Sequence, residues 1–228
     1  MMPGVAASML LRIEAGDGYD GATAVADFMA GIYLVNGIAV SASDIIDNVG
    51  FIETGGLRMS FDVEGYRARM LGGLRDAFLS GTLTFVIEWQ DDYANDDYLG
   101  PLNVADTSTG AGGAPDTMYQ YTWPNQQGFY DQPDPGTNRL VQPMVSPGLT
   151  PGGVRRVACT RTNTQFAMSV NGSAVSEDTN TGASLTTPDE AYLGGDQFSG
   201  WSTFQGYIRR VIVYPPVTNA ELPALSAL

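Results

Sequence analysis

Residues 81–89 read GTLTFVIEW, and they set the fold class because apolar and polar side chains alternate along them. Leu83, Phe85, Ile87 and Trp89 would share one face of a strand, with Thr82, Thr84, Val86 and Glu88 on the other. A second alternating run, residues 164–178 (TQFAMSVNGSAVSED), contains an Asn-Gly pair that supplies the positive φ angles of a type I′ hairpin turn. Residues 31–40 (GIYLVNGIAV) repeat that device. The sequence therefore predicts antiparallel hairpins.

Short strands with turn signals run through most of the chain, and helix signals are few. Residues 22–31 (ATAVADFMAG) could form one short helix, and a capping-box spacing from Thr218 to Glu221 predicts another at the C-terminus. Residues 103–137 are rich in Gly, Pro, Asn and Gln, which predicts two long surface loops around one strand, YQYTW. This pattern predicts an all-β, antiparallel two-sheet sandwich or jelly roll.

The composition excludes several kinds of chemistry. All 11 basic residues are Arg, because the chain has no Lys and no His, and 25 acidic residues leave a net charge of −14. An imidazole base, a Schiff-base lysine, a P-loop lysine and a histidine zinc site are therefore excluded. Catalysis would have to use Asp, Glu, Tyr, Arg or a metal bound by oxygen atoms. The negative charge also argues against nucleic acid as a partner.

Two further expectations follow from the apolar residues and the single cysteine. Cys159 has no partner for an intramolecular disulfide, and its strand-like surroundings predict a buried side chain. No apolar run approaches the roughly 20 residues that span a bilayer, and the N-terminus is a poor signal peptide. We therefore expect no membrane insertion and synthesis in the cytoplasm.

The last third of the chain resembles a known family. Residues 155–179 (RRVACTRTNTQFAMSVNGSAVSEDT) and 191–225 (AYLGGDQFSGWSTFQGYIRRVIVYPPVTNAELPAL) are similar to the C-terminal half of laminin G-like domains in the concanavalin A-like superfamily. The shared features are a strand that ends in VNG, an LGG turn, an F-x-G-x-I-x-x-V-x-x-Y strand and a closing NAEL turn. The resemblance is specific over residues 153–228 and weaker over 57–92. It implies a jelly roll at 51–228, with residues 1–50 as an N-terminal arm or hairpin and candidate docking element.

The variant is most similar to domains in structural proteins of tailed bacteriophages. The resemblance therefore implies a non-enzymatic virion structural protein, such as a capsid decoration, head-spike or tail component, that displays a lectin-like jelly roll to host surface glycans. The expected partners are other virion proteins, further copies of the chain and cell-surface polysaccharide. A stand-alone polysaccharide-binding module is the alternative, followed by a glycan hydrolase. No cofactor is expected to be required, and calcium is the one candidate ion.

Residues 88–98 (EWQDDYANDDY) form the densest acidic stretch, and they raise the question of catalysis. The superfamily includes β-glucanases with an E-x-D-x-x-E strand motif, from which this stretch departs because Gln90 replaces the middle acid. Glu88 and Asp92 would lie about 13 Å apart on a strand, whereas retaining hydrolysis needs about 5 to 5.5 Å. The catalytic interpretation is therefore rejected.

The same stretch could instead be a solvated turn or a cation site. It does not match EF-hand spacing, but laminin G-like domains often bind calcium at the rim of the sandwich through loop aspartates. The resemblance implies the candidate ligands Asp91, Asp92, Asn95, Asp96 and Asp97. A solvated turn is favoured over the calcium site.

Carbohydrate recognition, also implied by the resemblance, would use aromatic side chains as a platform. Tyr119, Tyr121 and Trp123 alternate on one face of the predicted strand, and Tyr130 and Trp201 lie in polar segments. The same alternation would equally suit core residues, and that interpretation is favoured.

Overall fold

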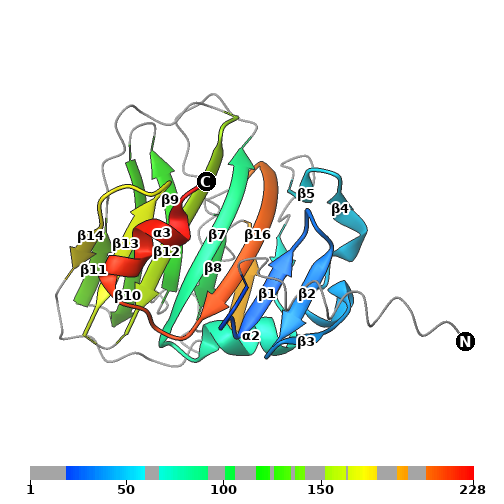
Figure 1. Ribbon diagram of the computed structural model, residues 1–228, viewed down its shortest axis with the longest axis horizontal. Helices are drawn as coiled ribbons and strands as arrows, with labels where there is room; N and C mark the ends of the chain where they lie inside the picture. Colours follow the sequence, from blue (N-terminus) through cyan, green and yellow to red (C-terminus); the bar gives the residue numbers. More distant parts are fainter. Residues whose placement is uncertain are drawn as a thin grey trace, which may run out of the picture.

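The computed structural model describes residues 19–59, 67–91, 101–105, 117–123, 126–134, 137–141, 152–162, 164–178, 189–194 and 204–228. Within them the chain forms two antiparallel sheets, as the sequence predicts (Figure 1). The larger sheet has the order β14 (Ser176–Asp178), β13 (Phe166–Val170), β12 (Val154–Arg161), β7 (Leu83–Asp91), β16 (Gly206–Tyr214), β1 (Ala24–Asp27), β2 (Ile32–Val35) and β3 (Ile38–Ala39). β5 (Gly56–Met59) also pairs with β16, and β4 (Ile52–Glu53) pairs with β5.

The smaller sheet has the order β11 (Thr137–Val141), β10 (Gln126–Asp134), β9 (Thr117–Trp123), β8 (Leu102–Ala105), β15 (Glu190–Leu193) and β6 (Ala68–Arg69). Helix α2 (Gly72–Leu79) lies at the lower end of β16 and β1 in Figure 1, and α3 (Leu222–Ser226) lies across β12 and β13. Among the described residues there are also three short 3-10 helices: η1 (Ala42–Asp44), η2 (Val49–Phe51) and η4 (Asn219–Glu221). No helix in the described part of the chain is long and apolar enough to cross a membrane.

Strand β7 is the centre of the larger sheet, paired with β12 on one side and β16 on the other. Its alternation confirms the sequence-based prediction. Leu83, Phe85, Ile87 and Trp89 are buried in the core between the sheets. Val86 belongs instead to a second apolar cluster on the outer face of the larger sheet, partly covered by Leu222 of α3. β7 is therefore buried on both faces, although its outer face carries Glu88.

Both Asn-Gly pairs form the predicted turns. Asn36 and Gly37 have φ angles of 49° and 75° between β2 and β3, and Asn171 and Gly172 have 48° and 75° after β13. The backbone N–H of Ser173 donates to the carbonyl of Val170 at 2.8 Å, which closes the second turn. Pairing between β13 and β14 resumes only at Met168 and Ser176, so this hairpin is looser than the first.

A bulge in β16 changes which of its residues share a face. Ile208 lies opposite Trp89 and Arg210 opposite Glu88, so Arg209 is the extra residue in the ladder with β7. An inserted residue shifts the alternation by one position. Ile208 therefore joins the inner core with Val211, not with Ile212 as unbroken alternation predicts.

The helix predicted at residues 22–31 is wrong, because Ala24–Asp27 form strand β1. The strand pairs with β16 and β2, and this tertiary pairing outweighs the helix propensity of alanine. Helix α2 was not predicted. Its buried residues Leu74, Ala77 and Phe78 have helical spacing. The two glycines at its start weaken the sequence signal for a helix.

The predicted loops in the range 103–137 also differ from the structure. Strand β10 occupies Gln126–Asp134, where the sequence predicts a loop, and it pairs with β9 and β11. Ladders on both sides stabilise a strand of low apolar content. Pro133 lies where the register between β10 and β11 shifts, which is a position that tolerates the missing N–H.

The described part of the predicted N-terminal arm is built into the sandwich. β1 extends the larger sheet beyond β16, and Ala24, Ala26 and Phe28 are in the inner core. Strands β1, β2 and β3 therefore continue the larger sheet of the jelly roll. A docking role for residues 1–50 stays a prediction.

Candidate functional site

The outer face of the larger sheet carries a row of alternating charges across four neighbouring strands. Arg156 of β12 lies opposite Glu88 of β7, Glu88 opposite Arg210 of β16, and Arg210 opposite Asp27 of β1. We call these four residues the charge row. Directly opposite residues of opposite charge stabilise a sheet. The bulge adds Arg209 to this face, and its Nε lies 3.5 Å from Glu88 Oε1.

Asp27 ends the row and is completely buried. Its carboxylate accepts hydrogen bonds from Arg210 Nε at 2.8 Å, from the backbone N–H of Ala30 at 2.8 Å and from the hydroxyl of Tyr19. Burial acts to lower the pKa of Arg210, but the charge of Asp27 and the interactions with Tyr19 and Glu88 outweigh it and raise that pKa. The guanidinium therefore stays positive and balances the buried acid.

Glu88 is held by arginines. Its Oε2 accepts a hydrogen bond from Arg156 Nε at 2.8 Å, and only 6% of the residue is exposed. Arg156 also donates to the backbone carbonyl of Ala227, so the charge row anchors the end of α3. Unbroken alternation along β16 would place Arg209 and Arg210 on opposite faces, but the bulge brings both to the outer face, where each pairs with an acid.

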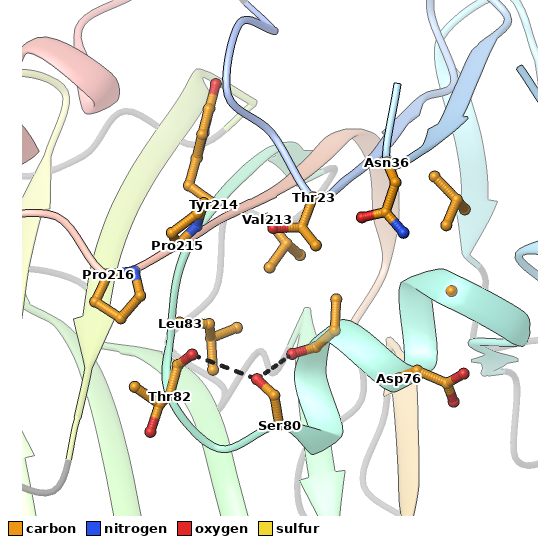
Figure 2. Close-up of a pocket in the computed structure, with 13 residues that line it drawn as sticks. Thr23, Asn36, Asp76, Ser80, Thr82, Leu83, Val213, Tyr214, Pro215 and Pro216 are labelled. Atoms are coloured by element: carbon orange, nitrogen blue, oxygen red, sulfur yellow. Dashed lines mark hydrogen bonds between the residues drawn. The ribbon is translucent and has the colours of Figure 1, made fainter. Parts of the chain in front are cut away.

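A solvent-open pocket lies at the corner where α2 meets the ends of β1, β2 and β16 (Figure 2). Its volume is about 540 Å³. It is lined by Thr23, Val35, Asn36, Gly73, Asp76, Ala77, Ser80, Thr82, Leu83, Val213, Tyr214, Pro215 and Pro216. We call it the corner pocket.

The walls of the corner pocket are chemically mixed. Pro215 and Pro216 form an apolar side that is exposed to solvent. Ser80 Oγ donates to the carbonyl of Ala77 at 2.8 Å, so its hydrogen is already used. Figure 2 shows the Tyr214 hydroxyl pointing away from Pro216 and Ser80. Burial raises the pKa of this phenol, although Arg210 and Arg156 act to lower it, so the group is neutral at physiological pH.

The family follows from a sequence comparison. The model of a laminin G-like family described as the concanavalin A-like lectin/glucanases superfamily matches residues 93–221, which is more than half of the chain. The chain belongs to this superfamily. Its two antiparallel sheets and short C-terminal helix agree with that membership. A comparison with curated proteins gives no match.

Solved structures of similar fold include carbohydrate-binding domains and sialidases. The CBM40 domain of the Ruminococcus gnavus IT-sialidase bound to α2,3 sialyllactose has a TM-score of 0.57 and 19% identity, over 76% of this chain and 93% of that one. The Trypanosoma rangeli sialidase in complex with 2,3-difluorosialic acid has a TM-score of 0.61 and 15% identity, over 97% of this chain and 38% of that one. Because the sequence identities are this low, these similarities concern the fold alone.

The structure does not describe the side chains of the five candidate calcium ligands. Asp91 ends β7, but its side chain is not described, and Asp92, Asn95, Asp96 and Asp97 fall outside the described residues. Within the described ranges, no group of three or more Asp, Glu or Cys residues is placed to hold a metal ion. The calcium site stays a prediction.

The predicted glycan platform is placed only in its backbone. Tyr119, Tyr121 and Trp123 are in β9, and the register puts Tyr119 opposite Tyr130 of β10. Directly opposite positions share a face of a sheet, so these four positions gather on one side of the smaller sheet. Trp201 falls outside the described residues. The platform stays a prediction.

Neither the charge row nor the corner pocket was predicted as a unit. Of their parts, the Asn36-Gly37 turn was predicted from the sequence. Nothing in the sequence indicates that Asn36, Thr82 and Pro216 lie around one cavity, because their proximity depends on how the sheet is assembled.

Proposed function

We propose that this chain is a non-enzymatic glycan-binding module. The observation that carries the proposal is a lectin-type two-sheet jelly roll whose best-placed strand carboxylate, Glu88, is tied to Arg156 and Arg209. The arginines already occupy this carboxylate, so it is not free to contact a glycosidic bond as hydrolysis would require. The carbohydrate-binding domain of similar fold that is bound to sialyllactose supports binding rather than hydrolysis.

The test is a glycan array probed with the full chain, together with a reducing-sugar assay on each glycan that binds. Retention of at least one glycan without release of reducing sugar is the expected result. Retention of none would contradict glycan binding. Release of reducing sugar would instead favour the hydrolase.

The site proposed for this binding is the aromatic face of β9 and β10. Trp123→Ala is expected to fold normally and to lose glycan retention, because stacking on an aromatic ring supplies much of the binding energy for a sugar. Circular dichroism checks the fold, and the array checks retention. Thr122→Ala, at the neighbouring position of the same strand, is the matched control and is expected to retain binding. An unfolded Trp123→Ala would identify Trp123 as a core residue.

A calcium site at residues 91–97 is proposed as an accessory to the module. The five oxygen-bearing side chains of this segment are the hard ligands that calcium prefers. Calcium titrated into chelator-treated protein is expected to release heat and to raise the melting temperature. If neither change occurs, the segment is a solvated turn.

A more specific proposal is that the chain is a virion component, such as a capsid decoration, head-spike or tail protein. It is supported by the resemblance of residues 153–228 to domains of bacteriophage structural proteins. Such parts assemble as symmetric oligomers, so we expect the purified chain to self-associate and to copurify with particle proteins. A monomer in solution scattering, with no copurifying particle protein, would count against this role.

A further inference from the structure

The corner pocket has the size of a small-molecule site. Its volume of about 540 Å³ lies within the roughly 300–1,000 Å³ usual for such sites. It is lined by α2, by strand ends of the larger sheet and by the segments next to them, whereas the proposed aromatic platform lies on β9 and β10 of the smaller sheet. A ligand in this pocket would therefore occupy a second site.

Three side chains of the pocket are available for hydrogen bonds with a ligand. The hydroxyls of Thr23 and Thr82 and the amide of Asn36 make no hydrogen bond to other described residues, and all three line the cavity. Figure 2 shows the Asn36 amide pointing between Thr23 and Asp76. Together these groups offer both donors and acceptors. That combination suits a ligand rich in hydroxyl groups.

Two prolines give the pocket an apolar surface as well. Pro215 and Pro216 directly follow β16, and both are exposed at the mouth of the pocket. A sugar ring has a hydroxyl-bearing edge and a face of C–H groups, so it can contact both kinds of wall at once. A fully apolar ligand would leave the hydroxyl and amide groups unpaired, which costs binding energy.

The charge of the pocket selects against anions. Of the described residues that line it, Asp76 alone is charged, and it already pairs with Arg75 at 3.0 Å. Its carboxylate points away from Tyr214 and the two prolines (Figure 2). No arginine is among the described residues that line the pocket to bind an anionic sugar, and the chain has a net charge of −14. A neutral ligand avoids this repulsion.

The pocket is held rigid by its surroundings. Asn36 sits in a left-handed turn, its N–H donates to the carbonyl of Thr23 at 2.8 Å, and the N–H of Thr23 donates to the carbonyl of Val213 at 2.7 Å. Gly73 lets α2 approach so closely that a Cβ there would lie 2.3 Å from Val35 Cγ1. A rigid wall reduces the entropy lost when a ligand binds.

We propose that the corner pocket binds one neutral hexose unit, with Thr23, Asn36 and Thr82 pairing with its hydroxyls and the two prolines contacting its C–H face. This inference deepens the glycan-binding function and rests on it, but it assigns a second site and a ligand class. The class differs from the acidic sialyllactose bound by the structural neighbour.

The test uses the full chain and four probes, which are the methyl glycosides of glucose, galactose and mannose, and free N-acetylneuraminic acid. Titration is followed by NMR shifts of the backbone amides of residues 23, 36 and 82. At least one neutral glycoside is expected to shift these amides and to saturate, whereas the acidic sugar is expected to shift none of them.

Two variants test the polar wall of the pocket. Asn36→Gly keeps the left-handed turn and removes the amide, and Thr82→Val removes one hydroxyl at nearly constant shape. Each is expected to weaken binding about five- to tenfold.

Thr164→Val, at an exposed threonine outside the pocket, is the matched control and is expected to leave affinity unchanged. The inference is overturned if no neutral glycoside shifts the pocket amides, if N-acetylneuraminic acid binds there as well, or if the pocket variants bind like the wild type. If Trp123→Ala loses array glycans while the pocket variants bind the neutral glycosides like the wild type, the proposed function stands and the second site is removed. An array with no binding at all would remove the proposed function.

Discussion

Asp27→Ala is expected to lower the free energy of unfolding by about 3–4 kcal/mol, because it removes one partner of a buried ion pair. Asp27 is completely buried and accepts hydrogen bonds from Arg210, Ala30 and Tyr19. Without it, the Arg210 guanidinium keeps its charge beside the outer apolar cluster with no acid at 2.8 Å. Loss of this ion pair would weaken the junction between β1 and β16, where the N-terminal hairpin joins the sandwich.

Urea unfolding followed by tryptophan fluorescence measures this loss. Asp76→Ala is the matched control, because Asp76 pairs with Arg75 at the surface, and exposed pairs contribute about 1 kcal/mol or less. The double variant Asp27→Ala with Arg210→Met is expected to be less destabilised than the sum of its single variants, since it leaves no unpaired charge. Equal losses for Asp27→Ala and Asp76→Ala would show that the charge row does not stabilise the sheet.

Gly56→Ala is expected to lower the free energy of unfolding by about 3 kcal/mol, since it combines backbone strain with a collision. Gly56 in β5 has φ of 120°, which is a conformation that residues with a Cβ rarely adopt. A Cβ there would lie 2.6 Å from the carbonyl oxygen of Ile208 and 3.1 Å from the Cα of Arg209. Both are backbone atoms at the bulge of β16, so they cannot move aside as a side-chain end could.

Gly50→Ala is the control for this variant. A Cβ at Gly50 meets nothing within 4 Å, and its φ is not in the left-handed region. Its free energy of unfolding is therefore expected to change by no more than about 0.5 kcal/mol. If urea unfolding gave similar losses for both glycine variants, the close approach of β5 to the bulge would be unimportant for stability.

Local patterns predicted the parts of the fold that depend on neighbouring residues in the chain. Alternation identified β7 and its inner face, and the Asn36-Gly37 pair identified the turn between β2 and β3. Alternation was misleading in β16, because a bulge forms only when two strands pair and one carries an extra residue. The helix propensity of residues 22–31 was misleading for the same reason, since β1 is stabilised by the strands on both of its sides.

The candidate sites also differ in whether the sequence alone could identify them. The sequence identified the aromatic strand and the acidic segment, because each is contiguous in the chain, and both stay predictions. The charge row needed the register of four strands before Arg156, Glu88, Arg210 and Asp27 could be seen as one unit. The corner pocket needed the packing of α2 against the ends of three strands.

The sequence by itself determined that this chain is an antiparallel β protein without histidine or lysine chemistry, and that its last third resembles laminin G-like domains. These properties follow from side-chain periodicity, turn residues and composition, which need no knowledge of distant contacts. Only the tertiary structure decided where Arg209 points, what Asp27 and Glu88 bind, and that Thr23, Asn36 and Thr82 surround one cavity. These arrangements depend on strand register and sheet order, and both arise from contacts between residues far apart in the chain.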